Sequence, residues 1–149
     1  MPGCLEKTIE TFLHQIFNQI ILVHQHPRTA FELNVQELHN DGCLVSCAVN
    51  STCMALLDAG IPMKDVVAAV TCCISSNGNI IIDPLASDLS DSKASLTVVV
   101  EAKTKSILAL TTEGMFTTAQ LNDSIKRCAQ TSETVFEHYL KYVKTQAQS

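Results

Sequence analysis

HNDGCLVSCAVNSTCMALLDAG, residues 39–60, places a polar turn in front of a long run of small and apolar residues. Residues 43–59 are small or apolar at nearly every position, which predicts a helix buried on most sides. Asp41 or Gly42 is placed to cap its start, and Gly60 is placed to end it. A turn that opens a helix is a usual place to bind a small anion, yet this helix start carries no basic side chain.

An amphipathic helix is predicted before this stretch. Apolar residues recur at helical spacing across residues 5–21, with polar residues on the other face, so we expect about five turns that end near His24. Between the two helices, Phe31, Leu33 and Val35 alternate with polar residues. That alternation predicts a half-exposed strand over residues 31–36.

Antiparallel strand pairs and a last helix are predicted after the buried helix. Asn77-Gly78 is a strong hairpin signal, and Thr117 with Gln120 forms a capping-box pattern that begins the last helix. The predicted strands are residues 66–74, 79–82, 96–101 and 106–110, the polar residues 83–93 form a loop, and the helix continues to about residue 143 before a polar tail from Lys144. The order α-β-α-β-β-β-β-α predicts an α+β fold, a layered sheet with packed helices.

Length and composition limit the classes of protein to which this chain can belong. A chain of 149 residues with 46% hydrophobic and 17% charged residues is typical of one folded domain, residues 1–149. No apolar run approaches the roughly 20 residues that cross a bilayer, and the apolar start carries too many polar residues for a signal peptide. We therefore expect an intracellular protein without a membrane partner. The net charge of −5 argues against strong nucleic-acid binding by this chain alone.

Neither the cysteines nor the acidic residues predict a metal site. An odd number of thiols without zinc-finger spacing favours small buried structural thiols over disulfides or metal ligands. The seven are Cys4, Cys43, Cys47, Cys53, Cys72, Cys73 and Cys128. Asp83, Asp88 and Asp91 could hold a hard cation through oxygen ligands, but the spacing is more typical of an exposed loop. No cofactor is predicted.

Several motifs resemble the RNase PH family, in order and over nearly the whole chain, from about Pro2 to Val143. They are HPRT (residues 26–29), MALLDAGIPM (residues 54–63), DSKA (residues 91–94), and Val135-Phe136 with Tyr139. The resemblance implies an RNase PH-like fold, of the ribosomal protein S5 domain 2-like kind. The family domain opens with strands that have no counterpart here, so we expect an N-terminally shortened domain: a fragment, a shorter isoform or a miscalled gene model. A sheet edge would then be uncovered unless a partner supplies the strands.

The same resemblance implies a vestigial active site. Active members bind the attacking phosphate with a Gly-Thr-Arg run that opens the buried helix, and the matching positions here are Cys43, Leu44 and Val45. A valine side chain cannot bind phosphate through charge and paired hydrogen bonds as a guanidinium does. Active members also use two aspartates; Asp91 matches the first, while Thr97 falls at the second. A hydroxyl does not replace a carboxylate as a hard-metal anchor.

The function implied by the resemblance is that of a non-catalytic structural subunit of the RNA exosome core ring. Such a subunit would support 3'-to-5' RNA processing and degradation, including rRNA maturation, in the nucleus, the nucleolus and the cytoplasm. Its partners would be other RNase PH-like ring subunits and cap subunits, with RNA handled by the assembled complex. The alternative is a free-standing homodimeric nuclease, metal-dependent or phosphorolytic. A third possibility is a dimerising or partner-dependent fragment that does not fold stably alone.

Overall fold

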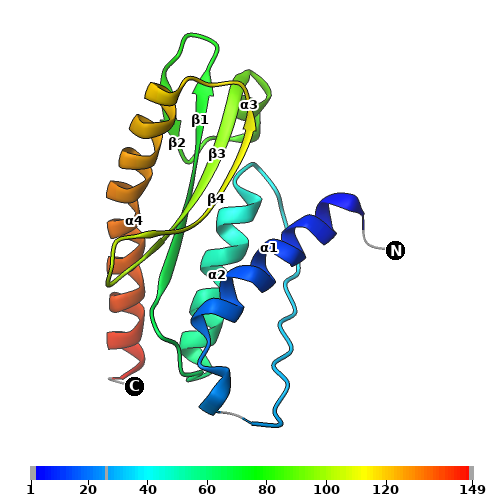
Figure 1. Ribbon diagram of the computed structural model, residues 1–149, viewed down its shortest axis with the longest axis vertical. Coiled ribbons are helices and arrows are strands. Elements are labelled where there is room, and N and C mark those ends of the chain that lie inside the picture. The colour runs from blue at the N-terminus through cyan, green and yellow to red at the C-terminus, as the bar shows by residue number, and fades with distance from the viewer. Residues whose placement is uncertain (1–2, 26, 148–149) are drawn as a thin grey trace.

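The computed structural model describes residues 3–25 and 27–147, and His26 of the HPRT motif lies outside them (Figure 1). The elements in order are α1 (Cys4–Ile20), η1 (Val23–Gln25), α2 (Leu44–Asp58), β1 (Val67–Ser75), β2 (Ile80–Ile82), α3 (Ala86–Ser90), β3 (Ser92–Glu101), β4 (Ile107–Gly114) and α4 (Thr118–Gln146). No helix among the described residues is both long enough and apolar enough to cross a membrane.

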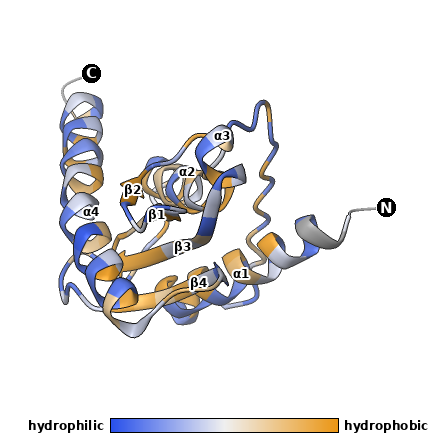
Figure 2. Ribbon diagram, turned by 90° about the horizontal axis from the view of Figure 1, so that it is seen from above, coloured by the Kyte–Doolittle hydropathy of each residue, from blue (hydrophilic) through white to orange (hydrophobic). Residues whose placement is uncertain are grey.

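One antiparallel sheet forms the middle layer, with strand order β2-β1-β3-β4. Helix α4 lies along one face of this sheet, and α2 with α1 lies on the other (Figures 1 and 2). The predicted α+β architecture is therefore confirmed. The Asn77-Gly78 hairpin is confirmed as well, because it joins β1 to β2 with Gly78 at a φ of 82°.

The two faces of the sheet build two hydrophobic clusters because successive strand residues point to opposite sides. The cluster toward α4 joins alternate residues of β1 and β3 to one helical thiol: Val70, Cys72, Ile74, Leu96, Val98, Val100 and Cys128. The cluster toward α2 holds Ala69 and Val99 with Val49 and Cys53 of that helix. The run of Val and Cys in β1 is thus a strand buried on both faces.

The amphipathic pattern of α1 buries Ile16, Phe17 and Ile20 against the α2 side of the core. The helix begins after Gly3, whose N–H donates to the Glu6 carboxylate at 2.6 Å. It ends at Ile20, somewhat before the predicted end near His24, and the chain then passes through the short 3-10 helix η1.

Helix α4 confirms the predicted capping box. The Thr117 N–H donates to Gln120 Oε1 at 3.0 Å, and the Gln120 N–H donates to Thr117 Oγ1 at 3.3 Å. The helix continues to Gln146, three residues beyond its predicted end near residue 143. Polar residues extend a helix without tertiary contacts when their helix propensity is good.

The predicted strand over residues 31–36 was wrong. Residues 27–41 form no helix or strand and pair with none of the four strands of the sheet. A strand is stabilised by a neighbour that takes its backbone hydrogen bonds, and no described strand lies beside this segment. Leu33 and Val35, expected to be half buried, are 43% and 51% exposed.

The polar residues 83–93 are not only a loop, as predicted, but contain α3. The Asp88 carboxylate accepts the Leu85 N–H at 3.1 Å and so caps this five-residue helix. Strand β3 then begins at Ser92, four residues before its predicted start at Leu96. The polar residues Ser92, Lys93 and Ser95 masked this extension in the sequence. It is stabilised by pairing with β1 and β4 on both sides.

Candidate functional site

The turn before α2 is held against the loop that leads into α3. The Ala86 N–H donates to the Asp41 carbonyl at 2.9 Å, and the Gly42 N–H donates to Asn40 Oδ1 at 3.1 Å. Gly42 has a φ of +101°, and a Cβ there would lie 2.6 Å from the Pro84 carbonyl oxygen. Only glycine fits this close approach.

Cys43, not Asp41 or Gly42, is the N-cap of α2, so the predicted cap was wrong. It adopts the left-handed conformation and gives no side-chain cap, because its thiol donates to the Pro84 carbonyl at 3.3 Å. Burial, reinforced by the Asp83 carboxylate, raises the pKa of the Cys43 thiol to about 12. The thiol is therefore protonated at neutral pH and is a poor nucleophile. The expectation of buried thiols fails only at Cys47, which is exposed, and at Cys43, which is half-buried, among the described cysteines.

A chain of buried hydroxyl groups connects β3 to the first turn of α2. Thr97 Oγ1 lies 2.9 Å from Thr71 Oγ1, which donates to Ser46 Oγ at 3.0 Å. Ser46 Oγ in turn donates to the Cys43 carbonyl at 2.9 Å. The Thr97 hydroxyl is thus engaged in a structural hydrogen bond between two strands.

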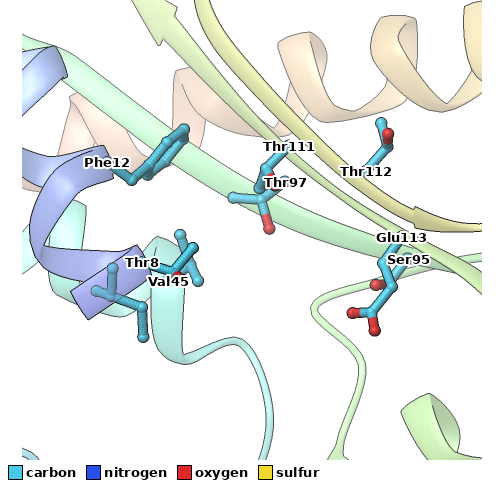
Figure 3. A pocket seen from close by; sticks show the side chains of 9 residues that line it. Thr8, Phe12, Val45, Ser95, Thr97, Thr111, Thr112 and Glu113 are labelled. Atoms are coloured by element: carbon cyan, nitrogen blue, oxygen red, sulfur yellow. The ribbon is translucent and has the colours of Figure 1, made fainter. Parts of the chain in front are cut away.

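A cavity of about 310 Å³ opens between α1, the first turn of α2, β3 and β4 (Figure 3). Its lining is made of hydroxyl and apolar side chains with one carboxylate: Thr8, Ile9, Phe12, Val45, Ser95, Thr97, Thr111, Thr112 and Glu113. None of these lining residues is Lys, Arg or His. The cavity therefore offers hydrogen-bonding oxygens and a negative charge, a lining that repels phosphate instead of binding it.

The cavity brings together two of the four positions expected to be vestigial. Val45 and Thr97 both line it, and Leu44 stands half-buried one residue before Val45. Asp91 is not among the lining residues; it is exposed, as the C-cap of α3. The carboxylate that does line the cavity is Glu113.

Sequence reasoning missed the lining residues that α1 and β4 supply. In β4, Thr111 lies opposite Thr97 and Glu113 lies opposite Ser95 in the ladder. The signal that could have found them is the second hairpin, since extending its register by a few residues places these side chains on the face of Thr97. Thr8 and Phe12 come from packing of α1 and have no signal of this kind.

The described residues contain no group of three His, Cys, Asp or Glu side chains able to hold a metal ion. Of the three aspartates considered from sequence, Asp88 caps α3, and Asp91 is exposed at its other end. The fold thus uses this acidic loop for local structure.

Two domains of one protein family match successive parts of the chain. "3' exoribonuclease family, domain 1" matches residues 1–62, and "3' exoribonuclease family, domain 2" matches residues 65–129. The chain belongs to this family, the RNase PH family. The first match ends after α2 and the second begins just before β1, so the hydroxyl chain from Thr97 to Cys43 crosses from one matched part to the other.

Relatives and solved structures agree with this family. The chain is 40% identical over 82 residues, 55% of its length, to an "Exosome complex exonuclease RRP46 homolog" of Arabidopsis thaliana. That alignment covers 34% of the relative, and the one with the rice (Oryza sativa subsp. japonica) protein of the same name also covers 34%, so the match spans about a third of these curated relatives.

The crystal structure of rice Rrp46 superposes with a TM-score of 0.91 at 26% identity, over 97% of this chain and 68% of that one. An Archaeoglobus fulgidus exosome with RNA bound to the active site gives a TM-score of 0.71 at 15% identity, over 93% of this chain and 63% of that chain. At that identity the second likeness shows the fold alone. The RNase PH-like fold expected from the sequence is confirmed.

Proposed function

We propose that this chain is a non-catalytic structural subunit of an RNA exosome ring, of the kind formed by its RRP46 relatives. What supports membership is the similarity to proteins named as exosome components together with the fold of rice Rrp46. In this role the chain contributes complementary surfaces to neighbouring ring and cap subunits. The complex as a whole then carries out 3'-to-5' RNA processing and degradation, including rRNA maturation.

The observation that supports the absence of catalysis is the lining of the cavity at the start of α2. Phosphorolysis needs a cationic group that binds the attacking phosphate, because a phosphate without a charge partner is not held in place. The cavity presents Val45 and Thr97 where active members of the family carry charged groups, and its one ionisable side chain is Glu113. Like charge between Glu113 and phosphate opposes binding.

The charge of the chain fits a scaffold that depends on its neighbours for contact with RNA. With 10 basic and 15 acidic residues, the chain carries a net charge of −5 and cannot neutralise many phosphates by itself. We therefore propose that RNA is bound through basic surfaces of the other subunits. The corresponding locations of the protein are the nucleus and nucleolus, and also the cytoplasm.

Affinity purification from cells of its own organism tests the assembly. The tagged chain is expected to co-purify with the other ring and cap subunits in fixed stoichiometry, measured by native mass spectrometry. Val45→Arg is a matched variant that changes the cavity and not the outer surfaces, so it is expected to co-purify the same set. Recovery of the chain without any ring subunit would overturn the proposal, and absence of the tagged chain from the nucleus and nucleolus in cell imaging would overturn the proposed location.

A further inference from the structure

The turn between β1 and β2 is built around the step from Asn77 to Gly78. The Gly78 N–H donates to the Ser75 carbonyl at 2.8 Å, and the Ser75 N–H donates to the Asn79 carbonyl at 2.9 Å. Residues 76–79 are exposed, and Gly78 takes the left-handed conformation that closes the turn. Among the described residues, no hydrogen bond holds the side-chain amide of Asn77. This amide is therefore accessible to chemistry with the backbone beside it.

Asn77 is the one asparagine of the chain that precedes a glycine. The backbone nitrogen of a following residue can attack the asparagine side-chain carbonyl carbon, and a bulky side chain on that residue hinders the attack. Gly78 has no side chain, so its nitrogen is open to this approach. Asn34 and Asn79 each precede a β-branched residue, valine and isoleucine, which crowds the nitrogen that would attack.

The remaining asparagines are held by the fold. Asn18, Asn50 and Asn122 lie within helices, where the next backbone N–H is kept in the helical hydrogen-bond pattern. The Asn50 amide is also engaged with β1 on both of its polar atoms. Asn40 Oδ1 accepts the Gly42 N–H at 3.1 Å, which fixes that side chain in its turn. Asn77 thus differs from every other asparagine in both its neighbour and its setting.

We propose that Asn77 is a site of spontaneous deamidation. The Gly78 nitrogen loses its proton to solvent base and attacks Asn77 Cγ. A C–N bond forms, and the side-chain nitrogen leaves as ammonia, so that a five-membered succinimide remains. Water then opens this ring at one of its two carbonyl carbons and yields aspartate or isoaspartate. The only co-reactant is water, and the modification does not depend on the proposed exosome role.

The turn itself controls the rate of this reaction. The attacking nitrogen of Gly78 is engaged with the Ser75 carbonyl, so the turn has to open before the ring can close. Strand β2 pairs with β1 only at Cys72, Cys73 and Ile74, and an exposed hairpin end with few pairs opens by local fluctuation. Deamidation in the folded chain is therefore slower than in the unfolded chain, but it is not prevented.

The two products act in opposite directions on the start of α4. The turn and this helix start lie at the same end of the molecule (Figure 1), and a Cβ at residue 78 would lie 3.8 Å from Gln120 Nε2. The first turn of α4 carries no acidic residue. Aspartate at position 77 adds a negative charge near the positive end of the helix, which is stabilising. Isoaspartate adds a methylene to the main chain and disrupts the turn.

Ageing of the purified full-length chain at mildly alkaline pH tests the site. Tryptic digestion yields one peptide, residues 65–93, that contains both Asn77 and Asn79. Mass spectrometry with electron-transfer fragmentation then locates each deamidation and separates aspartate from isoaspartate. We expect Asn77 to react at least tenfold faster than Asn79, an equally exposed control in the same peptide. We also expect Asn77 to react more slowly in the folded chain than in urea.

Two results would overturn the proposed site. One is an Asn77 that stays intact in the folded chain while it deamidates in urea, and the other is an equal rate at Asn77 and Asn79. Asn77→Asp reproduces the aspartate product and tests its effect on α4. The variant is expected to have a higher thermal unfolding midpoint than the original chain at low salt, and the difference is expected to disappear at high salt. A lower or unchanged midpoint at low salt would refute the stabilising contact with α4.

Discussion

The first turn of α2 and its middle use polar side chains in different ways. At the first turn, hydroxyl groups form a neutral chain behind a cavity, and none of the described residues that line this cavity is a cation. In the middle, the Asn50 side chain donates to the Ala69 carbonyl at 2.9 Å and accepts the Ala69 N–H at 2.8 Å. Tyr139 of α4 donates to Asn50 Oδ1 at 3.1 Å, so one amide joins a helix, a strand and a second helix.

This contrast shows where the fold depends on precise polar contacts. Strand β2 pairs only with Cys72, Cys73 and Ile74 of β1, so the earlier residues of β1 have no strand on that side within the described sheet. The Asn50 amide takes the place of a strand for Ala69 by satisfying both of its backbone groups. Buried backbone groups without partners are costly, so this contact maintains the architecture, whereas none of the side chains that line the cavity at the first turn of α2 is a cation.

The largest effect is expected for Asn50→Ala. The change leaves both backbone groups of Ala69 without their partner, and we expect a loss of about 2–4 kcal/mol in the free energy of unfolding. Urea denaturation measures it. Ser51→Ala, at the next and exposed position, is the control and should stay within about 0.5 kcal/mol of the original chain. If Asn50→Ala changed the free energy of unfolding as little as Ser51→Ala does, the Asn50 amide would not be replacing a neighbouring strand for Ala69.

A smaller effect is expected for Tyr139→Phe. The phenol is buried, a position that raises its pKa above the usual range, and removal of its hydrogen bond to Asn50 should cost about 1.5 kcal/mol. Tyr142→Phe removes a bond to Asp58 on the exposed side of α4 and should leave the free energy of unfolding nearly unchanged. Equal losses for the two variants would mean that the contact with Asn50 has no special role.

The hydroxyl chain at the first turn is expected to matter less. Thr97→Val keeps the shape of the side chain and leaves Thr71 its bond to Ser46, so a loss of about 1 kcal/mol is expected by urea denaturation. Thr111→Val, which lines the same cavity from the exposed β4, should change stability by less than about 0.5 kcal/mol. If Thr97→Val lowered the free energy of unfolding more than Asn50→Ala does, the hydroxyl chain at the first turn would be the more important polar contact.

The sequence predicted the parts of this comparison that depend on local signals. The capping box at Thr117 and the Asn77-Gly78 turn fix where α4 and β2 begin, because each depends on neighbours only a few residues apart. In the sequence, Asn50 is simply one polar residue within a helix of mostly apolar residues. Its role appears only when β1 brings Ala69 beside it, a contact that no spacing in the sequence encodes.

Only part of the candidate site could be predicted from the sequence. Val45 and Thr97 were singled out by resemblance and do line one cavity, whereas Glu113 reaches it only through pairing of β3 with β4. The alternation at Phe31, Leu33 and Val35 was read as a strand, but strand formation needs a partner and the described chain provides none. Helix α3 is only five residues long and depends on one cap at Asp88, too little for a periodic pattern.

The smallest effect concerns pH. Because the pKa of Cys43 rises from 9.0 to about 12 on folding, the native state retains a proton that the unfolded state releases in this range. The contribution of Cys43 to stability is complete below pH 9 and is lost as the pH rises toward 12. The free energy of unfolding should fall less steeply between pH 9 and 11 for Cys43→Ser than for the original chain. An unchanged slope would show that this thiol ionises as it does in the unfolded chain.

Phosphorolysis is the most direct test of the central claim that the pocket at the start of α2 has lost its chemistry. The purified chain is incubated with single-stranded RNA, inorganic phosphate and magnesium, and nucleoside diphosphates are measured. We expect no release above a control without protein, and no difference between the original chain and Asp91→Asn. Release that requires phosphate and disappears in Asp91→Asn would contradict the account and support the free-standing nuclease.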